Sequence, residues 1–503
     1  MRGFTFFLLT LALGLPTIAH AAAVNIHVTS SADSGPGSLR QAIIDGNALG
    51  ASYYPNILID LDSSQVINLS STLPQMTSSI VYISGTTTSS RAVVDGQNLY
   101  PILRASSNTA LFRLVNVTLQ NAYSTSYGAC LSLPATAGAA EVSNSWFEHC
   151  VAQGTYAGGG AIDASLAMNV HDSTFYDNAV RGSAIVNGGA IRLYSANTSA
   201  GLTISRCAFS TNLASTSSSQ LGQPAEGGAI YAQAGDVTIT DSLFDGNQAL
   251  AANAVGAAHG GAVAMFNASL DAIRNSFNAN WADAGGALYV STTNPTSNTA
   301  TLVNNTFAFN LAQNGVGGGL KSFGDVTLRN NTFAHNSADQ VGSSIAGSYY
   351  ATNPAPVVDA AWNNLVDGGM LNHDWCSGFA GATSAGYNIM PDSLCGFGNG
   401  TDSQVRTDLH LIGLGSTGSF NGATQQFERF PVVFLADGPA LDAGNPAATS
   451  DTTTSACPTT DGFGNPRPAD GNADGTQRCD IGAYEWQHEA PLFFDDFEDR
   501  SPR

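Results

Sequence analysis

The chain has 503 residues and a formal net charge of −21, yet only 11% of its residues are charged and Lys321 is its one lysine. This acidic balance argues against a nucleic-acid partner, because phosphates would be repelled, and against an anionic membrane surface. The low charge, together with 54 glycines and many Ser, Thr, Asn and Ala residues, favours an extended β surface over a helical protein.

The N-terminal residues have the pattern of a secretory signal peptide. Arg2 supplies the positive charge, residues 4–15 form the apolar core, and Ala19-His20-Ala21 is a small-x-small cleavage site. We expect residues 1–21 to be removed and the mature chain to be secreted or associated with the outer membrane at the cell surface. An N-terminal membrane anchor is the alternative, but the apolar run is short for a span, and we predict no transmembrane helix after it.

Residues 22–54 predict a cap at the start of the fold. Residues 24–29 alternate apolar and polar side chains as a strand does, and Ser38 is a suitable helix N-cap before a short amphipathic helix. The open end of a solenoid exposes unpaired backbone groups and a bare core, so a strand followed by a short helix suits a cap.

A recurring phrase dominates residues 55–435. Its first half reads small–polar–Phe–x–x–Asn, and its second half is Gly-Gly-Ala-aliphatic. The phenylalanines of the six copies are Phe175, Phe209, Phe244, Phe277, Phe307 and Phe333. The second half begins at Gly188, Gly227, Gly260 and Gly285. A fixed phrase at variable intervals indicates a rigid coil with loops of changing length.

These repeats predict a right-handed parallel β-helix with one coil per repeat. Stacking places each Phe over the next inside the core, and each Asn over the next at a turn, where the side-chain amides form a ladder. At about 30 residues per coil, residues 55–400 give roughly eleven coils and a rod roughly 50 Å long.

Seven cysteines favour an oxidising compartment. The predicted disulfides join residues that are close in sequence in loop-like stretches: Cys376 with Cys395, and Cys457 with Cys479. A further candidate pair, on consecutive coils, is Cys130 with Cys150. Cys207 is then left as a buried, inert thiol beside Phe209. The alternative is that all seven cysteines are reduced and buried.

Residues 436–486 are rich in Asp, Gly, Pro and Thr, and they include a candidate calcium loop. Asp470, Asn472 and Asp474 place oxygen ligands at alternating positions before a glycine. The loop departs from an EF-hand, because Ile481 occupies the position of the twelfth-residue Glu. A polar turn held by the Cys457 and Cys479 pair is the alternative. Residues 487–503 form a tail that is either an export or retention signal or an unstructured acidic segment.

Three segments carry a family resemblance. Residues 33–43 resemble the N-terminal cap motif of bacterial secreted β-helix proteins, with Gln41 in place of the usual Glu. The repeats are similar to those of polymorphic outer-membrane proteins. Residues 437–444, Arg467-Pro468 and residues 479–485 resemble the choice-of-anchor Q domain. The resemblance implies an exported surface or extracellular β-helix, in families whose members mostly have no assigned activity.

Catalytic chemistry has no recognisable motif in the repeats. A polysaccharide lyase needs a cation and a base, and a glycoside hydrolase needs paired carboxylates. The candidates on the coils are the acids Asp236, Asp241 and Asp245, the bases Arg206, Arg274, Lys321 and Arg329, and the scattered histidines His149, His171, His259 and His335. The acids and bases suggest solvated charges, and the histidines suggest surface or turn roles.

Tyr194, Tyr231 and Tyr289 follow the Gly-Gly-Ala phrase closely, so they are candidates for one row. An exposed row would favour carbohydrate binding, and the alternative is a stacked core or turn ladder. We therefore expect an exported, surface-associated adhesion or carbohydrate-binding protein without catalysis, whose partner is a polysaccharide or a host or neighbouring cell surface. The alternatives are a secreted polysaccharide lyase or glycoside hydrolase of the pectate-lyase-like fold, and a purely structural passenger.

Overall fold

The computed structural model describes the chain from residue 21 to residue 487, with gaps. The described ranges are 21–87, 90–195, 200–220, 222–233, 235–252, 256–291, 299–347, 358–367, 376–378, 382–391, 404–405, 411–412, 418–421, 426–429, 433–434, 438–447 and 456–487. Cys395, residues 1–20 of the predicted signal peptide and most of the tail therefore lie outside the described residues.

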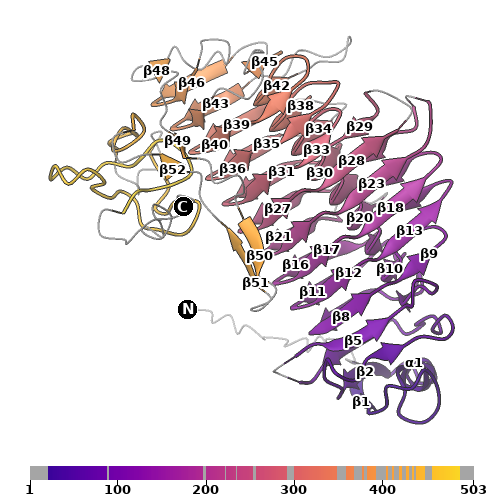
Figure 1. The fold of residues 1–503 in the computed structure, drawn as a ribbon. Helices are drawn as coiled ribbons and strands as arrows, with labels where there is room; N and C mark the ends of the chain where they lie inside the picture. Colours follow the sequence, from indigo (N-terminus) through magenta and orange to yellow (C-terminus); the bar gives the residue numbers. More distant parts are fainter. Residues whose placement is uncertain are drawn as a thin grey trace, which may run out of the picture.

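Parallel strands coil into a β-solenoid of about 11 turns, as Figure 1 shows. Successive coils add strands to five parallel sheets, of which two run along the whole solenoid and three are shorter. This confirms the predicted parallel β-helix and the predicted number of coils. The sheets are numbered below in the order in which the chain meets them around a coil.

Two sheets of 13 strands each form adjoining walls. The first sheet contains β1 (Ala22–Val28), β2 (Tyr53–Ile59), β4 (Ile80–Gly85), β7 (Leu111–Val115), β11 (Ala139–Ser143), β16 (Ala167–His171), β21 (Leu202–Ser205), β26 (Val237–Thr240), β31 (Leu270–Ile273), β35 (Ala300–Val303), β39 (Val326–Arg329), β43 (Val358–Trp362) and β46 (Ala382–Gly386). The second sheet contains β3 (Ile67–Asn68), β5 (Ala92–Asp95), β8 (Val117–Gln120), β12 (Trp146–Glu148), β17 (Thr174–Tyr176), β22 (Ala208–Ser210), β27 (Leu243–Asp245), β32 (Ser276–Asn278), β36 (Thr306–Ala308), β40 (Thr332–Ala334), β44 (Leu365–Val366), β47 (Ile389–Met390) and β48 (Gln404–Val405).

Three shorter sheets complete the coils. The third contains β9 (Tyr123–Ser124), β13 (Val151–Gly154), β18 (Ala179–Gly182), β23 (Leu213–Thr216), β28 (Gln248–Ala251), β33 (Trp281–Ala282), β37 (Leu311–Ala312) and β41 (Ser337–Ala338). The fourth contains β14 (Ala157–Gly158), β19 (Val186–Asn187), β24 (Ala225–Glu226) and β29 (Ala258–His259). The fifth contains β6 (Leu103–Arg104), β10 (Leu131–Leu133), β15 (Ile162–Ala164), β20 (Ile191–Tyr194), β25 (Ile230–Gln233), β30 (Val263–Phe266), β34 (Leu288–Ser291), β38 (Leu320–Ser322), β42 (Ile345–Gly347) and β45 (Cys376–Ser377).

Two antiparallel pairs lie in the C-terminal part of the chain. They join β49 (Leu411–Ile412) to β52 (Val433–Phe434) and β50 (Gly418–Asn421) to β51 (Gln426–Arg429).

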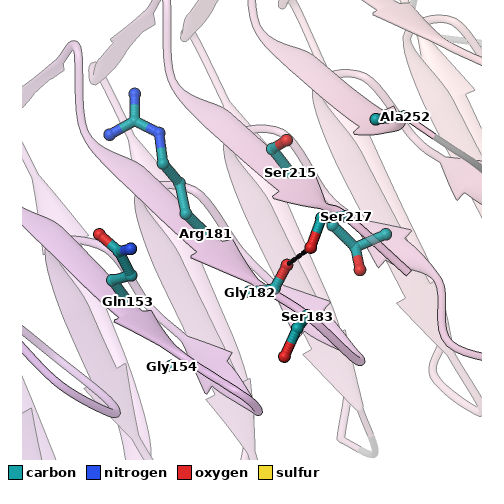
Figure 2. A pocket seen from close by; sticks show the side chains of 9 residues that line it. Gln153, Gly154, Arg181, Gly182, Ser183, Ser215, Ser217 and Ala252 are labelled. Atoms are coloured by element: carbon teal, nitrogen blue, oxygen red, sulfur yellow. Dashed lines mark hydrogen bonds between the residues drawn. The ribbon is translucent and has the colours of Figure 1, made fainter.

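The first, second and fifth sheets enclose the main core, while the third and fourth sheets form an arm beside it. The arm has a small core of its own, made of Ala152, Ala157, Val180, Val186, Ala214 and Ala225. On the outer face of the arm, residues of β13, β18 and β23 line an open depression of about 450 Å³ (Figure 2).

The Gly-Gly phrase joins the arm to the main body. Gly188 has a φ of +67° at the turn from β19 to β20, where a side chain would be strained. A Cβ on Gly189 would lie only 2.7 Å from the backbone of Leu213 on the third sheet. The first glycine therefore makes the turn, and the second allows the backbone to approach the third sheet closely where the arm joins the main body.

The predicted phenylalanine column is confirmed. The rings from Phe147 to Phe333 stack on successive coils with centroids 4.6 to 4.9 Å apart and planes within 12° of parallel. All are fully buried. Phe147 extends the column by one coil, in a copy of the phrase that has Cys150 in place of Asn.

The predicted asparagine ladder is also confirmed. Its members on successive coils are Asn178, Asn212, Asn247, Asn280, Asn310 and Asn336. In each step one Oδ1 accepts from both the backbone N–H and the side-chain amide of the coil before, as at Asn247, whose amide donates to Asn280 at 2.9 Å and to the Phe209 carbonyl at 2.9 Å. A second ladder begins at Asn275 and lines the turn between the first and second sheets.

The predicted N-terminal cap is present as α1 (Leu39–Asn47), which packs on β1 and β2. The Ser38 hydroxyl accepts a hydrogen bond from the Gln41 N–H at 3.2 Å, as an N-cap does. Leu39, Ala42 and Ile43 are buried at the end of the core, so the helix covers the first coil.

Candidate functional site

The charged residues of the regular coils form ion pairs between neighbouring turns. Arg206 binds both carboxylate oxygens of Asp172 at 2.6 and 2.7 Å, and Arg274 binds both oxygens of Asp241 at 2.7 Å. The expectation that they are solvated single charges is therefore wrong for these two arginines. Their guanidinium groups link successive coils, which gives them a role in stacking.

The predicted turn role of His149 and His335 is confirmed. Both have a φ of +53°, in the left-handed region. His149 lies 3.4 Å from an oxygen of Asp177, and His335 lies 2.9 Å from an oxygen of Asp367, which raises the pKa of His335 above its usual value. His259 differs, because it lies on β29 beside the fifth sheet.

The three tyrosines of the predicted row occupy two columns on the outward face of the fifth sheet. Tyr231 and Tyr289 belong to one column, with Arg192 on the coil before them. Tyr194 lies in the neighbouring column, opposite Gln233. The two columns differ in exposure, since Tyr231 and Tyr289 are buried and Tyr194 is 45% exposed.

The exposed end of these columns forms a compact group, here named the tyrosine–arginine site, of Tyr127, Asp163, Arg192 and Tyr194. Nη1 of Arg192 donates to Oδ1 of Asp163 at 2.9 Å from the directly opposite position on the next coil. The guanidinium carbon lies 4.4 Å from the Tyr127 ring centroid and 4.7 Å from that of Tyr194. Arg192 is thus held by one carboxylate and two aromatic rings.

Gly158 makes room for this arrangement. It lies on β14 of the fourth sheet, and a Cβ there would collide with Cδ of Arg192. Tyr127 pairs with Gly158 across a bridge, so the ring and the space for the arginine come from successive coils of the fourth-sheet edge. The corner between the fourth and fifth sheets therefore positions the arginine.

The ion pair is largely buried while the rings are not. The side chains of Arg192 and Asp163 are each 13% exposed, whereas Tyr127 is 38% exposed. Burial raises the pKa of Asp163 to about 6, although the neighbouring Arg192 opposes the shift. Nε of Arg192 is buried and has no hydrogen-bond partner among the described residues. The site thus presents aromatic surface around a fixed, partly unsatisfied charge.

The polar groups deeper in the same corner make their contacts with other groups of the protein. The ring of His259 stacks on Tyr289 at 4.4 Å, and Glu226 accepts from Asn187 at 2.8 Å. Nζ of Lys321 donates to a main-chain oxygen at 3.1 Å, and burial lowers its pKa to about 8. These residues are buried or nearly so, which leaves the tyrosine–arginine site as the accessible end of the corner.

Sequence reasoning did not single out Tyr127, Asp163 or Arg192. A signal was present, because Asp163, Arg192, Tyr231 and Tyr289 each follow the alanine of the Gly-Gly-Ala phrase by two residues. Aligning the copies at that alanine would have placed them in one column and shown that Tyr194 belongs to the next.

The structure contains two disulfides among the described residues, Cys130 with Cys150 and Cys457 with Cys479. Both pairings confirm predictions. Cys207 is the free, buried thiol that was expected, and burial raises its pKa to about 12. Cys376 is in disulfide form, but Cys395 lies outside the described residues, so that pairing stays a prediction.

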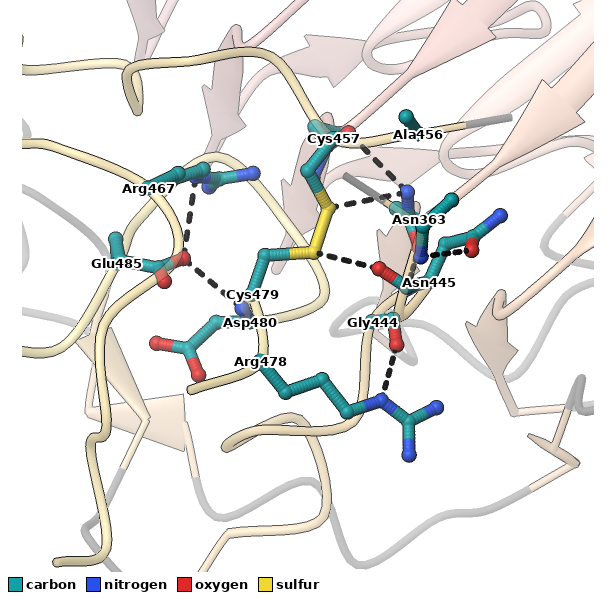
Figure 3. The surroundings of a disulfide bond; sticks show 12 residues. Asn363, Gly444, Asn445, Ala456, Cys457, Arg467, Arg478, Cys479, Asp480 and Glu485 are labelled. Atoms are coloured by element: carbon teal, nitrogen blue, oxygen red, sulfur yellow. Dashed lines mark hydrogen bonds and ion pairs between the residues drawn. A yellow bond between two sulfur atoms is a disulfide. The ribbon is translucent and has the colours of Figure 1, made fainter. Parts of the chain in front are cut away.

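The disulfide of Cys457 and Cys479 fastens a C-terminal loop, residues 456–487, which lies against the side of the last coils (Figure 3). Its contacts are made with turn residues of three successive coils. The side chains of Asn304, Arg329 and Asn330 donate to the main-chain oxygens of Thr460, Ala456 and Gly482. The Thr332 hydroxyl accepts from Ala483 N, and the Asn363 amide donates to Sγ of Cys457 at 3.3 Å. The loop is therefore held against the side of the coils by hydrogen bonds between side chains of the coils and groups of the loop, mostly of its main chain.

A buried charge cluster holds this loop together. Arg467 Nε lies 3.2 Å from a carboxylate oxygen of Glu485, and both side chains are buried (Figure 3). Glu485 also accepts from the N–H groups of Ala469 and Asp480. Burial raises the pKa of Glu485 to about 7, against the attraction of Arg467, and burial likewise raises the pKa of Asp480.

The candidate calcium residues form a tight turn. Oδ1 of Asp470 and Oδ1 of Asn472 both accept from the N–H of Asp474, at 3.1 and 2.9 Å. Asp442 lies beside them, and its pKa is raised by burial and by the charges of Asp470 and Asp474. Among the described residues no group of three or more His, Cys, Asp or Glu side chains is arranged to hold a metal ion. Calcium binding stays a prediction.

No helix in the described part of the chain is long and apolar enough to span a membrane. No protein-family model matches the chain, and no curated protein has a significantly similar sequence.

Proposed function

We propose that the protein is an exported β-helix that binds saccharide chains through the tyrosine–arginine site. The observation that carries this proposal is the pair of partly exposed rings, Tyr127 and Tyr194, whose centroids lie 4.4 and 4.7 Å from the guanidinium carbon of Arg192. Apolar faces of sugar rings pack on aromatic side chains, and a few fixed polar groups set the orientation of a ligand.

The Arg192 and Asp163 pair supplies those polar groups. The Arg192 side chain is 13% exposed, and a ligand hydroxyl would accept a hydrogen bond from that exposed part. Asp163 keeps the guanidinium in place from the next coil. A rigid pair of this kind reduces the entropy that binding would otherwise lose.

Export is supported by the two disulfides on separate parts of the fold. Disulfides persist in oxidising compartments outside the cytosol. As the family resemblance implies, we place the protein at the cell surface or outside the cell, with the polysaccharide of a host or neighbouring cell as its partner.

The test is a glycan array and titration with the protein beginning at residue 22. We expect the wild type to bind a subset of saccharides, and Tyr194→Ala to weaken that binding at least tenfold. Tyr176→Ala is the matched control, because Tyr176 is 37% exposed on β17 of another sheet and should leave the binding unchanged.

Two results would contradict the proposal. A wild type that binds no saccharide on the array would favour a structural passenger. Release of reducing or unsaturated ends from a panel of acidic and neutral polysaccharides would favour an enzyme.

A further inference from the structure

The outer face of the arm carries a second polar surface, which differs from the tyrosine–arginine site because no aromatic side chain lines it (Figure 2). Gln153, Arg181 and Ser215 lie directly opposite one another on β13, β18 and β23. They alternate with the alanine and valine residues of the small core, so their side chains point to the outer face. The row runs along the solenoid axis at about 4.8 Å per coil.

Arg181 stands out among the cations of the chain. Among the lysine and arginine side chains that the structure describes, all others except Arg104 are engaged with carboxylates or carbonyl oxygens of the protein. The side chain of Arg181 makes no hydrogen bond or ion pair with the described part of the chain, although the protein has a formal net charge of −21. An isolated guanidinium in such a chain is a local positive site.

The groups around Arg181 are uncharged and polar. Ser183 and Ser215 contribute hydroxyls to the depression, and Gln153 contributes an amide, while the Ser217 hydroxyl donates to Gly182 O at 3.2 Å. Thr216 turns its hydroxyl inward, to Ala184 O at 2.6 Å, so it does not compete for the guanidinium. The lining thus offers one cation and several hydrogen-bonding groups, and it contains no carboxylate.

We propose that this depression binds a carboxylate-bearing sugar residue of a saccharide chain. The planar fork of Arg181 matches a carboxylate with two parallel hydrogen bonds, and the hydroxyl and amide groups match sugar hydroxyls. The volume of about 450 Å³ lies in the range of small-ligand sites, roughly 300–1,000 Å³.

The net charge restricts the ligand further. A polymer with a negative charge on every unit would be repelled by the acidic surface as a whole. An isolated carboxylate in an otherwise neutral saccharide meets only Arg181 and its uncharged neighbours. The ligand is therefore a sparsely acidic saccharide. The proposal takes its ligand class from the proposed function but uses a separate site.

The experiment measures binding of disaccharides that contain one hexuronate, using glucuronate, galacturonate and mannuronate forms, against their neutral hexose counterparts. We expect at least one uronate form to bind at least tenfold more tightly than its neutral counterpart. Arg181→Gln should abolish this preference, and Arg181→Lys should retain part of it, because lysine keeps the charge but not the fork.

Arg104→Gln is the matched control, since Arg104 on β6 is exposed and its side chain likewise has no partner among the described residues. It should leave the preference intact, and so should Tyr194→Ala, which tests the other site. If Arg104→Gln lost the uronate preference to the same extent, the preference would be an effect of net charge, and the proposal would be overturned. The absence of any uronate preference in the wild type would also overturn it, even where Tyr194-dependent binding of neutral saccharides persists.

Discussion

The regular coils and the C-terminal loop are held by different forces. In the coils, each Phe and each Asn repeats the contact of the coil before, so stability comes from stacking and from amide ladders. The loop of residues 456–487 packs only a small apolar cluster, around Ile481, on Leu365 and Ile389 of the coils, and it is further held by hydrogen bonds, one disulfide and a buried cluster of charges. Repetition thus builds a stable core from weak local preferences, whereas a single-copy loop needs specific fastenings.

The largest expected effect comes from breaking the stack. Phe244→Ala removes a fully buried ring between Phe209 and Phe277, and we expect a loss of about 3–5 kcal/mol in the free energy of unfolding. Denaturant unfolding measures it. Phe244→Leu is the control, because it keeps most of the volume and should cost less. An unchanged midpoint for Phe244→Ala would contradict the burial of this column.

The loop should respond to its fastening without a change in the coils. Replacing both Cys457 and Cys479 by Ser opens a loop with a sequence separation of 22 residues, which we expect to destabilise the loop by about 3 kcal/mol. Hydrogen exchange should then accelerate for amides of residues 456–487, while the amides around Phe244 keep their protection. Equal acceleration in both regions would show that the two parts unfold as one unit.

The charge cluster should make the loop sensitive to pH, and the coils less so. The pKa of Glu485 is raised from 4.5 to about 7 in the folded protein, so the docked loop holds a proton that the undocked loop releases. The contribution to stability is complete below pH 4.5, declines as pH rises through 7, and is absent above it. Asp480 shifts in the same direction.

We expect loop stability to fall by roughly 2 kcal/mol between pH 5 and pH 8. Hydrogen exchange of residues 456–487, corrected for the intrinsic rate at each pH, measures the change. In the Glu485→Gln variant the side chain at this position cannot ionise, so the dependence of loop stability on pH should become flatter. A loop that becomes more stable toward pH 8 would contradict the sign of the shift.

The same contrast explains what the sequence could predict. The Phe and Asn columns were predictable because six copies of one phrase share these residues while the positions between them vary. Stacking is the way in which such copies bury a common face. The tyrosine–arginine site is different, since Asp163, Arg192 and Tyr231 occupy equivalent positions but are chemically unlike. The proposed function of this site depends on residues that differ between equivalent positions of the repeat, and repeated residues alone do not reveal such positions.

The C-terminal contacts were less predictable still. The pairing of Cys457 with Cys479 follows from their proximity in the chain, but nothing in the sequence indicates that the side chains of Asn304 and Asn363 bind the loop. These asparagines stand at left-handed turn positions of the coils, with φ of +56° and +54°, where asparagine is common for its own local reasons. Their second role, as hydrogen-bond partners of the C-terminal loop, exists only once the loop is docked.

The smallest expected effect concerns calcium at the turn of Asp470, Asn472 and Asp474. Their oxygens accept backbone N–H groups, and Asp442 adds a further negative charge nearby, so a hard cation would relieve repulsion between the carboxylates. With a dissociation constant of about 1 mM, 10 mM calcium would stabilise the loop by about 1.4 kcal/mol. Calorimetric titration should detect binding that Asp474→Ala abolishes, with magnesium as the control ion. If calcium produces no heat and no added protection of the loop, the backbone hydrogen bonds alone account for these side chains, and the turn is held by the disulfide and by Asp442.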